Sequence, residues 1–316
     1  MEFNEKIAGG LKGRDCLCLT DFSEEELFYI MDLATYIKDK TKKGEPYPVL
    51  QGKTLGMIFS KSSTRTRVSF EVGMVQLGGY PIFLSENDMQ LGRGETMGDT
   101  AKTLSRYLDG IMIRTFSHKT VIELADNASI PVINGLTDLL HPCQILADLL
   151  TIKEKKGTLK GLKMTYIGDG NNIANSLLTG CAMVGMDIAV VAPSGYEPEK
   201  SIVADAKSIA KKNGSKVIID NNLQDIIEGS DIVYTDVWTS MGQEKETQER
   251  LKVFNKYQVN SEILKRTKKD VLVMHCLPAH RGEEITAEVI DGPNSVVFDQ
   301  AENRMHAQKG LMAAVL

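Results

Sequence analysis

One short segment in the first half of the chain combines residue types that suit a phosphate group. It reads SSTRTR and follows an apolar run of strand length. A helix beginning here would offer free backbone N–H groups and a partial positive charge to an anion. Its hydroxyl and guanidinium donors are Ser63, Thr64, Arg65, Thr66 and Arg67. The segment predicts an anion site, and spacing alone leaves open a capped helix with solvated arginines.

A second polar segment, Gly168–Asn172, also follows an apolar run and precedes a helical pattern. It resembles the dinucleotide-binding fingerprint only in part, because Ile173 stands where the third glycine is required. The G-x-x-x-x-G-K phosphate loop is absent from the chain. These observations argue against a nicotinamide dehydrogenase and against a P-loop enzyme.

Strand-sized apolar runs alternate with helix-sized periodic segments along the whole chain, and this pattern must position the polar groups. The predicted strands are Thr54–Ser60, Tyr80–Ser85, Gly110–Thr115, Pro131–Leu136, Lys163–Gly168, Ile188–Ala192, Lys216–Asp220, Asp231–Asp236, Val271–His275 and Ser295–Phe298. Continuous apolar strands between helices indicate parallel sheets covered on both faces. In such sheets ligands bind beyond the carboxyl ends of the strands.

We therefore predict an α/β fold with two doubly wound parallel-sheet domains joined by a long helix. The first domain would span residues 1–140, the joining helix 141–157 and the second domain 158–302. A length of 316 residues suits two such domains.

Composition excludes several classes of function. The formal net charge of −5 argues against nucleic acid as a main partner. No stretch of about 18 apolar residues is present, so we expect no membrane span. The five cysteines form no CxxC pair, which disfavours a zinc site or a disulfide framework and fits a reducing compartment. The N-terminal residues show no targeting pattern, so we expect a cytoplasmic protein with no metal and no cofactor.

Four short motifs carry a resemblance to a known family. They are Ser63-Thr64-Arg65-Thr66, His141-Pro142-Cys143-Gln144, the loop Asp236–Gly242 and His275-Cys276-Leu277-Pro278. Their order and spacing resemble those of the aspartate/ornithine transcarbamylase family, and the last two resemble its ornithine branch. The resemblance covers nearly the whole chain, and four motifs in register are far more specific than one.

The resemblance implies roles for individual residues. Carbamoyl phosphate would be bound by Ser63, Thr64, Arg65, Thr66, Gln90, Arg114, His141, Gln144, Cys276, Leu277 and Arg304. Ornithine would be bound by Asn172, Asp236, Ser240 and Met241. The residues implied in catalysis are Arg114, His141, Asp236, Cys276 and Arg304.

The implied reaction passes the carbamoyl group of carbamoyl phosphate to the side-chain amine of L-ornithine and yields L-citrulline and phosphate, a step of arginine metabolism. The resemblance also implies that a C-terminal helix, 303–316, returns to the first domain. It further implies a homotrimer in which Gln90 reaches the site of a neighbouring subunit. We expect Cys276 to orient the amine and not to act as a covalent nucleophile.

Other interpretations remain open from the sequence. A sister enzyme could use putrescine or another amine, and a non-catalytic relative could serve as a binding subunit. Among single residues, His141 could cap a helix and Cys276 could be a core residue at the end of a strand. Asn172 could be a helix cap, a ligand or both.

Overall fold

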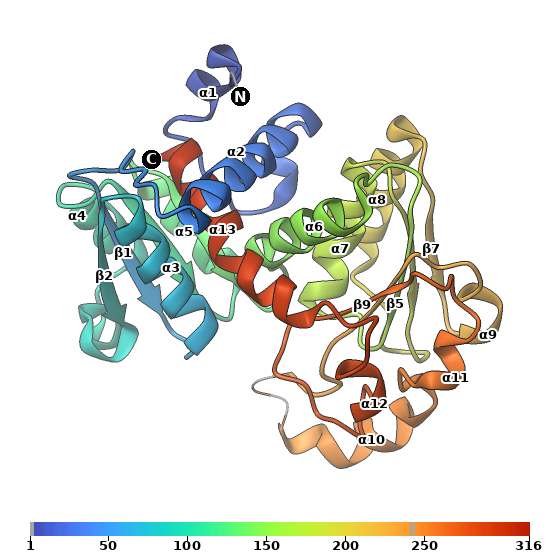
Figure 1. Ribbon diagram of the computed structural model, residues 1–316. Helices are drawn as coiled ribbons and strands as arrows, with labels where there is room; N and C mark the ends of the chain where they lie inside the picture. The colour runs from blue at the N-terminus through green and yellow to red at the C-terminus, as the bar shows by residue number, and fades with distance from the viewer. Residues whose placement is uncertain (1–2, 241, 243) are drawn as a thin grey trace. The chain divides into compact units, whose positions relative to one another are not determined.

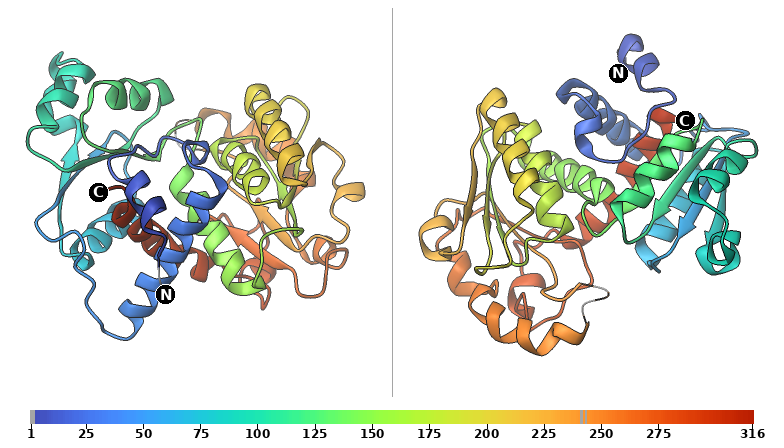
Figure 2. Two further views of the ribbon diagram at one scale, coloured as in Figure 1. Left: turned by 90° about the horizontal axis from the view of Figure 1, so that it is seen from above. Right: turned by 180° about the vertical axis from the view of Figure 1, so that it is seen from behind.

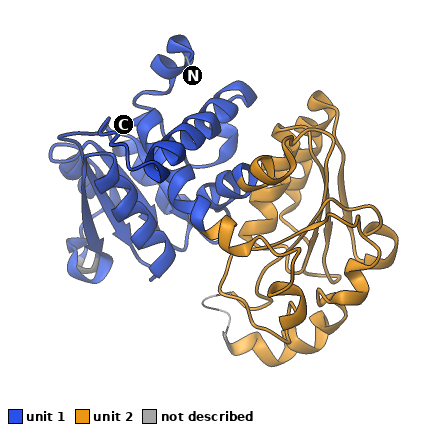
Figure 3. Ribbon diagram, in the orientation of Figure 1, with its two compact units in different colours: residues 1–150, 302–316 blue, residues 151–301 orange. Residues whose placement is uncertain are grey.

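The computed structural model describes residues 3–240, 242 and 244–316 (Figure 1). The chain divides into two compact units (Figure 3). Unit 1 consists of Met1–Leu150 and Glu302–Leu316, and unit 2 consists of Thr151–Ala301. Each unit has its own sheet and its own buried core. The predicted class, two parallel α/β domains, is therefore confirmed.

Unit 1 is built on a four-stranded sheet in the order β2-β1-β3-β4, and every pair in it is parallel. The strands are β1 (Thr54–Phe59), β2 (Tyr80–Ser85), β3 (Gly110–Arg114) and β4 (Val132–Leu136). The longer helices are α1 (Glu5–Leu11), α2 (Glu24–Lys42), α3 (Thr64–Gln76), α4 (Met97–Leu104), α5 (His118–Asn127) and α6 (Pro142–Lys156), whose last residues belong to unit 2. Short 3-10 helices are η1 (Leu19–Asp21), η2 (Glu86–Asp88) and η3 (Gln90–Arg93).

Unit 2 is built on a five-stranded parallel sheet in the order β7-β6-β5-β8-β9. The strands are β5 (Lys163–Ile167), β6 (Asp187–Val191), β7 (Val217–Asp220), β8 (Ile232–Thr235) and β9 (Leu272–His275). The helices are α7 (Asn172–Met183), α8 (Lys200–Asn213), α9 (Leu223–Ile226), η4 (Glu244–Glu246), α10 (Thr247–Phe254), η5 (Asn255–Tyr257), α11 (Ser261–Leu264), α12 (Ala287–Ile290) and α13 (Val297–Val315), which continues into unit 1.

The C-terminal part of α13 packs closely against α2 within unit 1, and both views of Figure 2 show the two helices together. A Cβ atom added at Gly310 would lie 2.7 Å from the carbonyl oxygen of Ile30 and 2.7 Å from the Ala34 Cβ. Glycine therefore permits this close approach. Lys38 of α2 also donates a 2.7 Å hydrogen bond to the Asn303 amide oxygen of α13. The predicted return of the C-terminal helix to the first domain is confirmed.

One predicted strand is wrong. Ser295 makes a single parallel bridge with Val273, but α13 begins at Val297. Three apolar residues in a row, Val296 to Phe298, fit a buried strand and the first turn of a helix equally well, so the pattern could not separate them. Phe298 is 71% exposed, which a core strand would not allow.

Helix α3 carries three valines at helical spacing that face solvent and not the core. Val68, Val72 and Val75 are 50%, 38% and 59% exposed, whereas Phe70 and Met74 are fully buried. The helix itself is confirmed, and the valines form an apolar stripe on its outer side. No helix among the described residues is long and apolar enough to cross a membrane.

Candidate active site

In unit 1 the polar groups gather where strands end at their carboxyl side. From β1 the chain adds β2 on one side of the strand and β3 on the other, so the strand order switches direction between β1 and β3. Phe59, the last residue of β1, pairs in register with Arg114, the last residue of β3. A reversal of strand order of this kind is where open parallel sheets bind ligands. The fold thus places the start of α3 and the side chain of Arg114 at one edge.

Helix α3 begins as the sequence predicts. The Ser63 hydroxyl caps it by accepting a 3.2 Å hydrogen bond from the Thr66 backbone N–H. A side-chain cap satisfies one of the free N–H groups at a helix start and leaves others directed outward. The segment therefore has the geometry of an anion-binding helix terminus.

Two arginines from distant parts of the chain converge on Thr66. The Arg304 Nη2 donates to Thr66 Oγ1 at 3.3 Å, and the Arg114 Nη1 donates to the same oxygen at 3.5 Å. All three side chains are buried, with exposures between 1% and 7%. Two guanidinium groups sharing one neutral hydroxyl create a strongly positive site, which suits a phosphate or a developing oxyanion.

A further hydrogen-bonded chain fixes Arg304. Its Nη1 donates to Gln144 Oε1 at 2.6 Å, and the Gln144 Nε2 donates to Asp148 Oδ1 at 2.8 Å. Gln144 and Asp148 lie one turn apart on α6 and are both buried. Asp148 sets which end of the Gln144 amide faces Arg304. Asp148 was not predicted as a site residue, because its only signal in the sequence is a lone carboxylate on the apolar side of a predicted helix.

His141 stands directly before α6 and is 4% exposed. Burial, and after it the charges of Arg304 and Arg114, lower the pKa of His141 well below its usual value. The imidazole is therefore neutral at neutral pH. A neutral imidazole can donate one hydrogen bond to a carbonyl oxygen without adding a third positive charge.

The other residues predicted for carbamoyl phosphate lie nearer the surface of unit 1. Thr64 and Gln90 are exposed, and Ser63 and Arg65 are partly buried. Arg67, a donor considered from the sequence, is turned away. Its Nε donates to Glu71 at 3.0 Å, and its guanidinium lies 3.8 Å from the Phe83 ring centroid. Arg67 thus fits the interpretation of a solvated arginine on the helix surface.

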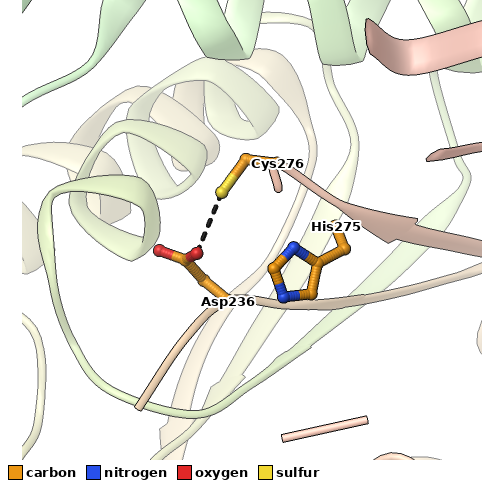
Figure 4. Close-up of side chains that lie close together, drawn as sticks. All are labelled: Asp236, His275 and Cys276. Atoms are coloured by element: carbon orange, nitrogen blue, oxygen red, sulfur yellow. Dashed lines mark hydrogen bonds between the residues drawn. The ribbon is translucent and has the colours of Figure 1, made fainter. Parts of the chain in front are cut away.

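In unit 2 the register of two neighbouring strands brings two predicted residues together. Thr235 of β8 pairs with His275 of β9, so Asp236 and Cys276 follow these strands side by side. The Cys276 thiol donates to Asp236 Oδ1 at 2.9 Å, and Figure 4 shows the two side chains turned toward each other. Asp236 is 6% exposed. A buried carboxylate at the end of a strand is suited to holding an ammonium group.

The loop after β5 supplies a second donor to Asp236. The Asn171 Nδ2 donates to Asp236 Oδ2 at 2.9 Å, while its Oδ1 caps α7 by accepting from the backbone of Ile173 and Ala174. The helix cap is therefore Asn171, and the interpretation of Asn172 as the cap is wrong. Asn172 is the first residue of α7 and is partly buried beside this loop.

Leu277 has an unusual backbone conformation, with φ at +59°, and precedes a cis peptide bond to Pro278. A branched residue with positive φ stores strain and requires support from its surroundings. The Leu277 N–H donates to the His275 Nδ1 at 2.9 Å. Ser240 is partly buried, and Met241 lies outside the described residues.

The side chains of Asp236, His275 and Cys276 could offer ligand atoms to a metal, since these atoms lie within 4.8 Å of one another. Both ring nitrogens of His275 are engaged, however. The Nδ1 accepts from Leu277, so the Nε2 carries the proton and faces Glu284 Oε1 at 3.1 Å. A metal here would have to displace one of these bonds.

Two family models together match almost the whole chain. Residues 14–154 match the carbamoyl-P binding domain of aspartate/ornithine carbamoyltransferase, and residues 160–315 match the Asp/Orn binding domain. Ornithine carbamoyltransferase of Oceanobacillus iheyensis is 60% identical over 306 residues, covering 97% of this chain and 95% of the relative. That of Bacillus subtilis is 57% identical over 306 residues, with coverages of 97% and 95%.

Solved structures of ornithine carbamoyltransferases are also similar to this chain over nearly its whole length. The ornithine carbamoyltransferase of Pyrococcus furiosus superimposes with a TM-score of 0.94 at 53% identity, covering 96% of this chain and 97% of that one. The ornithine carbamoyltransferase of Gloeobacter violaceus gives a TM-score of 0.86 at 48% identity, with coverages of 96% and 99%. The likeness therefore extends over both units.

Proposed function

Because the chain belongs to the aspartate/ornithine carbamoyltransferase family, we propose that it transfers the carbamoyl group of carbamoyl phosphate to the side-chain amine of ornithine. The products are citrulline and phosphate. The observation that carries this function is the match of both units to ornithine carbamoyltransferases at 53–60% identity. No relative reported above supports a different amine or a non-catalytic role.

Carbamoyl phosphate binds unit 1. Its phosphate group binds at the start of α3 and accepts hydrogen bonds from the guanidinium groups of Arg114 and Arg304. Further donors are Ser63, Thr64, Arg65 and Thr66. The convergence of both arginines on Thr66 Oγ1, at 3.3 and 3.5 Å, supports this placement. Gln90 is exposed, as expected of a residue that serves a neighbouring subunit.

The reaction is an acyl transfer. The amine nitrogen forms a bond to the carbonyl carbon, the carbonyl oxygen gains negative charge, and the bond to the phosphate oxygen then breaks. The phosphate leaves with the electron pair and can accept the proton that the amine loses. Arg114, Arg304 and the neutral His141 stabilise the developing oxyanion, and one donor of this kind contributes roughly 10²–10³ in rate.

Ornithine binds unit 2. Asp236 holds the α-amino group, and Asn172, Ser240 and Met241 complete the contacts with the amino-acid end. Cys276 and Leu277 line the region of the reacting amine. The bonds from Cys276 and Asn171, both 2.9 Å, hold the Asp236 carboxylate in one orientation. Such prior orientation reduces the entropy that the reacting amine must lose.

The protein acts as a homotrimer in the cytoplasm. The outer side of α3 exposes Val68, Val72 and Val75, and the edge strand β2 exposes Tyr80 and Phe83. An apolar surface of this kind indicates contact with another protein, here a second copy of the chain. All five cysteines are free thiols, which fits a reducing compartment.

A citrulline assay with ornithine and putrescine in parallel tests the function. We expect turnover with ornithine and a kcat/KM for putrescine lower by about 10²-fold or more, because putrescine lacks the α-amino and carboxylate groups. An Asp236→Asn variant should lose much of this preference. The assignment is wrong if carbamoyl phosphate and ornithine give no citrulline, or if putrescine is the better substrate.

A further inference from the structure

A tight turn after β9 brings one imidazole and two carboxylates together. The ligand atoms of His280, Glu283 and Glu284 lie within 4.8 Å of one another. The His280 Nδ1 is 3.7 Å from Glu283 Oε2 and 3.9 Å from Glu284 Oε2. These separations are too long for hydrogen bonds. They lie close to the spacing of about 3.4 Å that two ligands take around one tetrahedral zinc ion.

The second carboxylate has an oxygen that no other described group satisfies. Glu284 is fully buried, and its Oε1 accepts from the backbone N–H of His280 at 2.6 Å and from the His275 ring at 3.1 Å. Its Oε2 is buried and accepts no hydrogen bond in the described part of the chain. A buried carboxylate oxygen without a donor or a cation is costly. Because this oxygen faces the His280 ring, a cation between the two would satisfy it.

The turn is held in one conformation by its backbone. The Gln258 Nε2 donates to the carbonyl oxygens of Gly282 and Glu283, each at 2.9 Å. The Gly282 N–H donates to the Ile285 carbonyl at 2.9 Å, and the Glu283 N–H donates to the His280 carbonyl at 2.9 Å. Gly282 has φ at +94°, which favours glycine. Ligands on a fixed turn lose little freedom when an ion binds.

The nearest cationic side chain along the turn is committed elsewhere. Arg281 donates to both carboxylate oxygens of Asp291, at 2.7 and 3.0 Å. Two carboxylates and one imidazole match a divalent ion in charge, and this mixture of nitrogen and oxygen ligands suits zinc and similar metals. The His280 and Glu283 side chains are 52% and 41% exposed, so an ion can enter from solvent.

We propose that His280, Glu283 and Glu284 form a binding site for a divalent transition-metal ion of the zinc class. The site leaves a coordination position open to water, because three protein ligands do not complete a tetrahedron. It is separate from the reaction residues, although the Glu284 carboxylate also bonds the His275 ring, which precedes Cys276 in the chain.

Cobalt(II) is the probe for this site, since its visible absorption reports the ligand geometry and a thiolate ligand adds a distinct near-ultraviolet band. The titration is done in a Cys276→Ser background, which removes the only thiol of the neighbouring Asp236–His275–Cys276 cluster. We expect one ion per chain, bound without a sulfur band. Zinc(II) should displace the cobalt.

His280 is exposed and Glu283 is partly exposed, so variants at these two ligands should fold normally. His280→Gln and Glu283→Gln should each weaken cobalt binding by about tenfold or more, on the scale of losing a group that supports a metal. Glu262→Gln is the matched control, because Glu262 is an exposed carboxylate of the same unit. The cobalt affinity of this variant should equal that of the Cys276→Ser background. Failure of the Cys276→Ser protein to bind cobalt, or equal affinity in all three variants, would overturn the proposal.

Discussion

The Cys276 thiol donates a 2.9 Å hydrogen bond to Asp236 Oδ1, so the sulfur is held as a donor beside a carboxylate. The other carboxylate oxygen accepts from the Asn171 amide at 2.9 Å. The first contact follows from the register of β8 and β9, which sets Asp236 and Cys276 beside each other, and the second from the pairing of β5 with β8, which brings the loop of Asn171 to Asp236. A thiol in this arrangement is suited to orienting groups around Asp236 and is poorly suited to nucleophilic attack, which requires the thiolate.

Replacing Cys276 with serine or alanine separates these two roles. Serine can donate the same hydrogen bond, so we expect Cys276→Ser to retain most of the activity. Cys276→Ala removes the donor, and loss of a hydrogen bond to a charged group corresponds to a fall of about 10–100-fold in kcat/KM for ornithine. Steady-state citrulline formation provides the measurement. Trapping of a carbamoyl-thiol intermediate by rapid quench in the unmodified protein would contradict the orienting role.

Lysine at Arg114 or Arg304 tests the anion site. The charge is kept but the forked geometry that reaches Thr66 and Gln144 is lost. We expect Arg114→Lys and Arg304→Lys each to lower kcat/KM for carbamoyl phosphate by about 10²-fold or more. Arg67→Lys is the matched control, because Arg67 pairs with Glu71 on an exposed surface, and its kinetics should hardly change. Equal effects in all three variants would refute the assigned roles.

Alanine at Gly170 should disturb the ornithine side selectively. A Cβ atom there would lie 2.3 Å from backbone atoms of Glu197 and Pro198, so the loop that carries Asn171 must move. We expect KM for ornithine to rise by about tenfold, on the scale of a lost hydrogen bond to Asp236, with KM for carbamoyl phosphate little changed. Gly10→Ala, where a Cβ meets no atom within 4 Å, is the control. Parallel rises in both KM values would indicate general destabilisation instead.

The strands of both sheets could be predicted because buried parallel strands are continuous apolar runs. The prediction failed at Ser295–Phe298, since only tertiary packing decides whether so short a run becomes a strand or the start of a helix. The same limit applies to α3: a helix beginning at the segment SSTRTR could be predicted, but not that its valines face outward. When a helix has apolar residues on two faces, their spacing does not tell which face packs into the core.

The residues of the site also divide into those that the sequence could predict and those that it could not. A serine cap at the start of α3 could be predicted, though not whether Ser62 or Ser63 provides it, since a cap acts on residues two or three positions away in the chain. Asn171 was missed in favour of Asn172, because a shift of one residue at a helix start is not visible in the sequence. Asp148 and Glu284 were also missed. Their roles depend on which side chains the fold brings to them from other elements.

The free energy of unfolding at acid pH should depend on His306, which is buried in α13. Burial, and after it the charges of Lys309, Lys38 and Lys42, lower the pKa of His306 from 6.5 to about 3, while Glu302 Oε1 lies 3.5 Å from its Nε2. Between about pH 6.5 and 3 the unfolded chain therefore binds a proton that the folded chain does not. The contribution of this group to the free energy of unfolding is absent above this range and becomes increasingly unfavourable as the pH falls through it.

A His306→Gln variant removes this proton uptake by the unfolded chain. We expect its free energy of unfolding to fall less steeply with decreasing pH, with a slope smaller by about one proton between roughly pH 6 and 4. Urea denaturation at several pH values gives both slopes. The comparison at pH 8, where the imidazole is neutral in both states, isolates the effect of the substitution on packing. Identical slopes for the two proteins would show that His306 takes up its proton in the folded state at an ordinary pH.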